Sequence, residues 1–135
     1  DVIVRLCADN PLIEPDEIDT IIRYFIWDKK AVMYSNTHNI QDNGYPDGLG
    51  SEVYSIKSFK EIDFITSFMS DKYREHPHKY FELHGKVETC PARKEIRYSH
   101  LKLDVNTQQE YEYIKGIYDK FGHNDFHFTD YAKEA

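Results

Sequence analysis

Apolar and polar positions change along the chain in blocks that predict short strands alternating with helices. Residues 1–6, DVIVRL, are rich in β-branched side chains and predict a buried strand. Residues 15–30 carry isoleucine and phenylalanine at helical spacing, and the proline at position 15 suits a first helical turn. Residues 31–35, AVMYS, predict a second strand, so the chain opens as strand, helix, strand.

The rest of the chain continues this alternation after a long polar loop over residues 36–50, and loops of this length are often functional. Pro77 is expected to interrupt the helical pattern of residues 70–84. Tyr111 and Tyr118 lie at helical spacing and are predicted to be core. Strands are predicted at 51–56, 87–92 and 100–105, and helices at 58–69, at 107–121 behind a T-Q-Q-E capping box, and at 130–135 behind Thr129.

Alternating strands and helices favour an α/β domain with a mostly parallel sheet. The length of 135 residues suits one domain. In such sheets, ligands bind beyond the carboxyl ends of the strands. Two acids lie at such ends: Asp9 follows the first strand, and Asp104 ends the strand predicted at 100–105.

Composition limits the partners of this domain. The chain has 24 acidic and 17 basic residues, a net charge of −7, which argues against a general nucleic-acid or anionic-membrane surface. It leaves room for a local phosphate site. No apolar run approaches the roughly 20 residues of a membrane span. Cys7 and Cys90 stand in unrelated contexts, which favours two reduced thiols in a cytoplasmic protein over a disulfide or a zinc site.

Several polar positions leave two interpretations open. Asp9, in CADNPLI, fits a metal site at a strand end or a turn carboxylate that accepts backbone N–H bonds. Asp104 and Asn106 would share one side of a strand and face one cation, or would only end the strand before the helix cap. Arg5 fits a buried salt bridge or a group on the active side. Residues 45–50 fit a substrate loop or an ordinary turn.

Four segments, in the same order, resemble cytidylyltransferases that activate acidic sugars. They span nearly the whole chain, and the closest family members are spore-coat polysaccharide cytidylyltransferase-like proteins. The relatives that act on sialic acid and ketodeoxyoctonate are more distant. The four segments are VRLCADNPLI, YPDGLGSEVYS, YREHPHKYF and LKLDVNTQQEYEYIKGIYD. The resemblance implies a Rossmann-like, GT-A-like nucleotide-diphospho-sugar transferase domain with three αβα layers.

The family begins with a strand and a phosphate-wrapping loop of the form AR-x-x-S-x-R-L-P-x-K, which has no counterpart here. Residues 1–135 are therefore predicted to be a single partial domain, the carboxyl-terminal portion of a nucleotidyltransferase domain. The sheet would then have an uncovered edge and an uncovered apolar face. Such a piece is expected to form a homodimer or to be poorly stable alone.

The resemblance assigns roles to individual residues. It implies that Asp9 and Asp104 are catalytic and that they hold Mg²⁺ together with Asn106, where the family has aspartate. It implies a substrate-proximal loop in which Gly50 replaces an acid that the family often has. The substrate-binding residues it implies are Arg5, Asn36, Asp47, Gly48, Glu52, Arg74, Glu75 and His76.

The function that follows is cytidylyl transfer from CTP to a sugar acid, with release of pyrophosphate, in surface polysaccharide biosynthesis. This holds for the complete protein, and residues 1–135 alone are expected to be inactive. The alternative is a non-catalytic sugar-binding or dimerisation module derived from a nucleotidyltransferase, which the missing phosphate loop, Asn106 and Gly50 favour. A third reading is a glycosyltransferase of related fold, which would bind a nucleotide-sugar and release no pyrophosphate.

Overall fold

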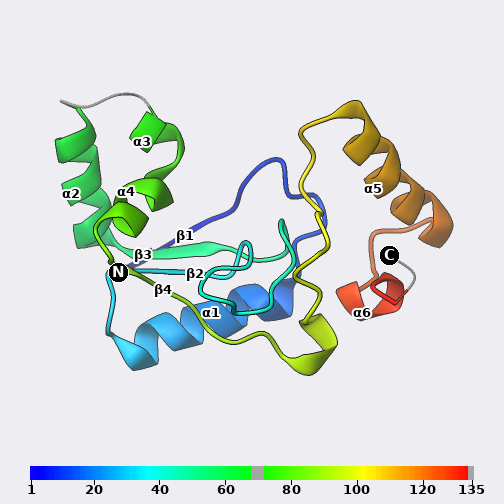
Figure 1. Ribbon diagram of the computed structural model, residues 1–135, viewed down its shortest axis with the longest axis horizontal. Coiled ribbons are helices and arrows are strands. Elements are labelled where there is room, and N and C mark those ends of the chain that lie inside the picture. Colours follow the sequence, from blue (N-terminus) through cyan, green and yellow to red (C-terminus); the bar gives the residue numbers. More distant parts are fainter. Residues whose placement is uncertain (68–71, 134–135) are drawn as a thin grey trace.

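A four-stranded sheet lies at the centre of the molecule, with its strands in the order β1-β3-β2-β4 (Figure 1). The computed structural model describes residues 1–67 and 72–133. The strands are β1 (Val2–Arg5), β2 (Met33–Ser35), β3 (Glu52–Ser55) and β4 (Val87–Glu88). The helices are α1 (Pro15–Asp28), α2 (Ile56–Thr66), α3 (Lys72–Glu75), α4 (Pro77–Leu83), α5 (Gln108–Phe121) and α6 (Phe128–Tyr131), with a 3-10 turn, η1 (Lys94–Ile96).

The sheet is mixed, so the expectation of a mostly parallel sheet is wrong. Strand β3 runs antiparallel to both β1 and β2, whereas β4 runs parallel to β2. The cause is the connection between β2 and β3, which is a loop and not a crossover helix. Without a crossover the chain reverses direction, and β3 enters the sheet between β1 and β2 in the opposite sense.

The two faces of the sheet bury two separate apolar clusters. Met33 is paired with Tyr54, and both pack with residues of α2, α4 and β4. Tyr34 is paired with Val53, and both pack in the larger cluster, which includes Ile21 of α1 and residues of α5 and α6. Because successive strand residues face opposite sides, adjacent positions of β2 and β3 serve the two clusters. The predicted three-layer αβα arrangement is confirmed.

Helix α1 begins at Pro15 as predicted and ends at Asp28, where Lys29 adopts a left-handed conformation with φ 52°. Its buried stripe is shorter than the sequence predicts. Ile21 is fully buried, but Ile26 and Trp27 in the last turn are exposed. Apolar periodicity therefore located the helix correctly and overestimated the length of its buried face.

Strand β1 is also less buried than its apolar sequence predicts. It lies at one edge of the sheet, and Val2, Val4 and the following Leu6 are all exposed. Residues in an edge strand have a neighbouring strand on one side only, so their β-branched side chains need not be covered.

Three local predictions near the carboxyl end are wrong. Residues 100–105 do not form a strand, since Lys102 makes an isolated bridge with Asp47. Tyr111 is about half exposed, not core. The last helix begins at Phe128 with His127 as its cap, so Thr129 lies inside it, and residues 134–135 of the predicted helix lie outside the described part. In contrast, the Thr107–Glu110 capping box of α5 is present as predicted.

Among the described residues, none of the helices has the length and apolar character needed to cross a membrane.

Candidate functional site

A polar cleft of about 390 Å³ opens between the turn after β1, the loop after β2, the end of β3, the start of α4 and the segment before α5. It brings together residues that are far apart in the sequence. Six of the residues predicted for the site line it: Asp9, Asp47, Glu52, His76, Asp104 and Asn106.

The turn after β1 presents Asp9 to this cleft. Asn10 N–H donates to the Cys7 carbonyl at 3.1 Å, which closes the turn. Val105 N–H donates to the Asp9 carbonyl at 2.8 Å, which ties the turn to the segment before α5. The Asp9 backbone is therefore fixed on both sides. Its side chain is exposed, so the carboxylate is accessible to a ligand.

Asp47 is held beside Asp104 by backbone bonds. Its N–H donates to the Leu101 carbonyl at 3.0 Å, and its carbonyl accepts from Leu103 N–H at 2.8 Å. Gly48 makes this approach possible, because its φ is +89° and a Cβ there would lie 2.7 Å from the Asp104 nitrogen. Burial, with repulsion from Asp104, raises the pKa of the Asp47 carboxyl. Gly48 thus allows the loop at residues 47–48 to approach the segment at residues 103–104, and it does not itself line the cleft.

One of the two carboxylate oxygens of Asp104 accepts a hydrogen bond from a neighbouring side chain. Its Oδ2 accepts from Asn106 Nδ2 at 2.5 Å, so the two side chains face the same side as the sequence predicts. Its Oδ1 is buried and has no hydrogen-bond partner among the described residues, and the Lys102 Nζ lies 3.8 Å away. A buried carboxylate oxygen without a donor is costly unless a ligand supplies one or a cation binds there.

These groups fit a Mg²⁺ ion only as an open site. No three His, Cys, Asp or Glu side chains within residues 1–67 and 72–133 are arranged to enclose a metal ion. Mg²⁺ is commonly bound by one or two carboxylates, and substrate phosphates and water complete its coordination. Asp9 and the unpartnered Asp104 oxygen supply that limited donor set. Asn106 donates its amide to Asp104 in this arrangement, so its own oxygen would have to turn to serve as a ligand.

Glu52 is the buried acid of the cleft. Its Oε2 accepts from Arg5 Nη1 at 2.9 Å and from Tyr54 OH at 2.6 Å, and its Oε1 lies 2.9 Å from His78 Nδ1. Arg5 also donates to the Glu75 carbonyl at 2.9 Å. The salt-bridge interpretation of Arg5 is therefore confirmed, and the guanidinium connects β1, β3 and the end of α3.

Asn36 and Gly50 support the loop from behind the cleft. Asn36 is fully buried, donates from Nδ2 to the Glu17 carbonyl at 2.8 Å and accepts from Ser51 N–H at 2.9 Å. A Cβ on Gly50 would lie 2.1 Å from Asn36 Oδ1. The predicted substrate contact of Asn36 is not supported by this placement. An acid at position 50 would not fit against Asn36 here.

The Arg-Glu-His segment at positions 74–76 divides between the cleft and the surface. Arg74 is more than half exposed and contacts Asp63 of α2 at 3.4 Å. The Glu75 side chain is largely exposed, with its carboxylate 3.8 Å from His76 Nε2. Of the three residues, His76 alone lines the cleft, and the structure does not bring Arg74 or Glu75 to it.

Sequence reasoning missed part of the cleft wall. His38, His78 and Lys79 also line it. The His78 ring lies 6.2 Å from that of His38 and 5.6 Å from that of His76, measured between ring centroids. The only sequence signal for this group is the H-x-H spacing of positions 76 and 78. That three histidines and four acids line one cleft becomes visible only in the fold.

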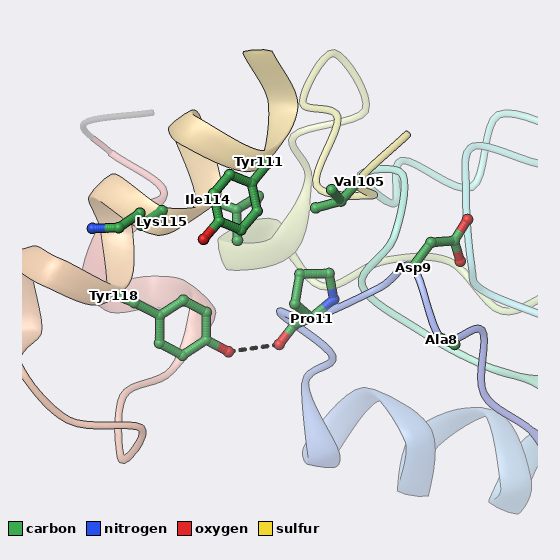
Figure 2. A pocket seen from close by; sticks show the side chains of 8 residues that line it. All are labelled: Ala8, Asp9, Pro11, Val105, Tyr111, Ile114, Lys115 and Tyr118. Atoms are coloured by element: carbon green, nitrogen blue, oxygen red, sulfur yellow. Dashed lines mark hydrogen bonds between the residues drawn. The ribbon is translucent and has the colours of Figure 1, made fainter. Parts of the chain in front are cut away.

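A second hollow of about 400 Å³ shares Asp9 with the cleft (Figure 2). Its lining is mostly apolar and comes from Ala8, Asp9, Pro11, Val105 and one face of α5. Tyr118 OH donates to the Pro11 carbonyl at 2.7 Å and joins α5 to the turn after β1. Tyr111, which was predicted to be core, instead forms part of the wall of this hollow.

The mixed αβα fold is similar to that of a nucleotidyltransferase, as a comparison with known structures indicates. No family model matches the chain. The chain is 28% identical over 130 residues to the spore coat polysaccharide biosynthesis protein SpsF of Bacillus subtilis. The aligned region covers 90% of this chain and 48% of SpsF. It superposes on the structure of a cytidylyltransferase from Leptospira borgpetersenii with a TM-score of 0.80 and 25% identity, over 98% of this chain and 55% of that chain.

The predicted resemblance is therefore confirmed: the chain is homologous to SpsF and has the fold of a cytidylyltransferase. It spans about half the length of the curated relative that it matches. Its assignment to the carboxyl-terminal portion of the complete domain stays a prediction.

Proposed function

We propose that the complete protein transfers a cytidylyl group from CTP to a hydroxyl of a sugar acid and releases pyrophosphate. The observation that carries this proposal is the convergence of Asp9, Asp47 and Asp104 in one cleft, with one Asp104 oxygen buried and unpartnered. The names of the two relatives support the cytidylyl group and the connection to polysaccharide synthesis.

In this proposal Asp9 and Asp104 hold the Mg²⁺ that accompanies the nucleotide. When bound, the ion would offset negative charge on the phosphates and on the leaving pyrophosphate. The chain's own part is positioning. The backbone bonds of Asp9 to residue 105, and of Asp47 to residues 101 and 103, hold the backbone of both acids in place beside the cleft. Glu52, His76 and His78 line the same cleft, and the hydroxylated acceptor would lie beside them.

The test is pyrophosphate release by the complete protein with CTP, Mg²⁺ and a panel of sialic acid, ketodeoxyoctonate, glucuronate and gluconate. Asp9→Asn and Asp104→Asn are expected to lower turnover by at least about 100-fold while leaving the circular dichroism spectrum and unfolding midpoint nearly unchanged. Asp125→Asn, at an exposed position outside the cleft, is the matched control and should retain wild-type turnover. Near-normal turnover in both site variants would contradict the proposal.

One observation favours a second candidate, a non-catalytic sugar-binding or dimerisation module. Asn106 brings no charge and occupies one Asp104 oxygen with its amide, which reduces the oxygens available to a cation. Calorimetric titration of the complete protein separates the two candidates. A catalytic protein binds CTP more tightly with Mg²⁺ than without it. A module binds a sugar acid or self-associates in sedimentation, with no response to nucleotide or Mg²⁺.

A further inference from the structure

One lysine lines the polar cleft without a carboxylate partner. Among the described residues that line the cleft, Lys79 is the only lysine or arginine, beside four acids. It lies in α4 and is partly buried. Lys79 forms no ion pair with an acidic side chain in the described part of the chain, whereas Arg5 is paired with Glu52 at 2.9 Å. A cation that is partly withdrawn from water without a counter-ion is costly, so an anionic ligand would be stabilised beside it.

The acceptor of the proposed reaction is an acid, and most of the charge around the cleft is negative. Three aspartates line the cleft, and the triphosphate of CTP would bring further negative charge. Mg²⁺ would offset part of that charge, and Arg5 already balances the charge of Glu52. A carboxylate that enters the cleft therefore needs one more cation close to it, because repulsion from the acids and phosphates would otherwise weaken its binding. Lys79 is the cation that the chain provides there.

The arginine that the resemblance implies for substrate binding does not supply this charge. Arg74 lies outside the cleft and contacts Asp63 at 3.4 Å. Lys79 follows in the next helix, where its backbone N–H donates to the His76 carbonyl at 3.1 Å. His76 and His78, from the same segment, also line the cleft, with their ring centroids 5.6 Å apart. An ammonium group together with two imidazoles offers several hydrogen-bond donors to a carboxylate and its neighbouring hydroxyls.

We propose that Lys79 binds the carboxylate of the acceptor and so selects acids over neutral sugars; this rests on the proposed function. The contact is non-covalent. The Lys79 ammonium group donates to the carboxylate oxygens in a partly dehydrated site, where a charged hydrogen bond is stronger than at a free surface. Because an ammonium group is a point charge without a preferred planar partner, phosphate oxygens also suit it. The phosphates of CTP are therefore the other anions to be tested.

The first experiment measures binding to the complete protein without CTP. Calorimetric titrations use each acid of the panel and the primary amide of the same acid, which has nearly the same shape and no charge. The wild type should bind at least one acid about tenfold or more tightly than its amide. Lys79→Met should abolish this preference, and Lys79→Arg, which keeps the charge, should retain most of it.

Lys60→Met is the matched control, because Lys60 is an exposed lysine of α2 outside the cleft, and it should bind like the wild type. Far-UV circular dichroism and the unfolding midpoint show that each variant is folded. A preference for the acid that persists undiminished in Lys79→Met overturns the proposal. So does a wild type that prefers none of the acids to its amide.

The second experiment measures pyrophosphate release by the complete protein with CTP, Mg²⁺ and the same acids. Lys79→Met should raise the KM for the acceptor about tenfold or more and leave the KM for CTP unchanged. A raised KM for CTP with an unchanged KM for the acceptor assigns Lys79 to the phosphates, which overturns this inference and leaves the proposed function standing. Absence of turnover in the wild type counts against the proposed function, and the acid and amide titrations still decide whether Lys79 binds a carboxylate.

Discussion

Gly50→Ala is the substitution for which the structure gives the sharpest prediction. A Cβ at position 50 would lie 2.1 Å from Asn36 Oδ1 and 2.3 Å from the Asn36 carbonyl oxygen. Both distances are far inside van der Waals contact, and one of the atoms is backbone. Asn36 is fully buried and has no room to turn toward solvent. The loop over residues 45–50 must therefore move away from β2, or the Asn36 amide must give up its hydrogen bonds.

The size of the effect follows from those bonds. Asn36 accepts from Ser51 N–H at 2.9 Å and donates to the Glu17 carbonyl at 2.8 Å. Each lost hydrogen bond costs about 1 kcal/mol, and a buried group left without a partner adds about 1–3 kcal/mol. Part of this is recovered if the loop shifts, so we expect Gly50→Ala to lower the free energy of unfolding by about 2–4 kcal/mol.

Gly116→Ala is the matched control because the chemical change is identical and the surroundings are not. Gly116 lies inside α5, and an added Cβ would meet nothing within 4 Å. Alanine in a helix interior is favoured over glycine, so this variant should gain about 0.5–1 kcal/mol. Urea unfolding followed by far-UV circular dichroism measures both changes, and an unchanged m-value shows that midpoints can be compared. A loss below about 1 kcal/mol in Gly50→Ala, or an equal loss in Gly116→Ala, would refute the reasoning.

Three further predictions concern charged and buried polar groups. Hydrogen bonds from Lys102 and from backbone N–H groups lower the pKa of Glu110 to about 2, so its stabilising contribution is present above about pH 4.5 and is lost as the pH falls toward 2. In Glu110→Gln the free energy of unfolding should therefore depend less on pH between about 4.5 and 2, as measured by urea titrations at several pH values. Because Asp104 repels the Asp47 carboxylate, Asp104→Asn should lower the pKa of Asp47 in an NMR titration of its carboxyl carbon, and an unchanged pKa would show that burial alone raises it. Tyr45→Phe removes the hydroxyl that donates to the buried Glu17 at 2.5 Å and should cost about 1–3 kcal/mol in urea unfolding, a result that an unchanged midpoint would contradict.

The sequence predicted the elements whose causes are local. Helix α1 begins at Pro15, and α5 begins after the Thr107–Glu110 capping box, because caps and apolar periodicity act within a few residues. The segments that resemble cytidylyltransferases were equally visible, and they implied a metal site at Asp9 and Asp104 and a substrate loop that contains Asp47. The structure places all three in one cleft.

Errors arose where the outcome depends on a partner distant in the sequence. Residues 100–105 alternate like a strand, yet only Lys102 forms a bridge, with Asp47. The partner here is a loop, which Gly48 allows to approach the backbone of residues 103–104, and a loop does not continue the pairing. Asn36 has the polarity of a ligand-binding residue, but the fold surrounds it with Glu17 and Ser51. Tyr111 has core-like spacing and lies on a helix face that borders an open hollow.

The sequence by itself determined the kind of domain, the positions of α1 and α5, and the residue types available for chemistry. Hydrophobic periodicity, helix capping and the order of the four segments are all readable along one dimension. Tertiary structure alone decided that β3 lies antiparallel between β1 and β2, and that Glu52 at its start is buried against His78 of α4. Pairing across 26 residues depends on how the sheet and α4 close around the cleft, and no local pattern in either segment specifies it.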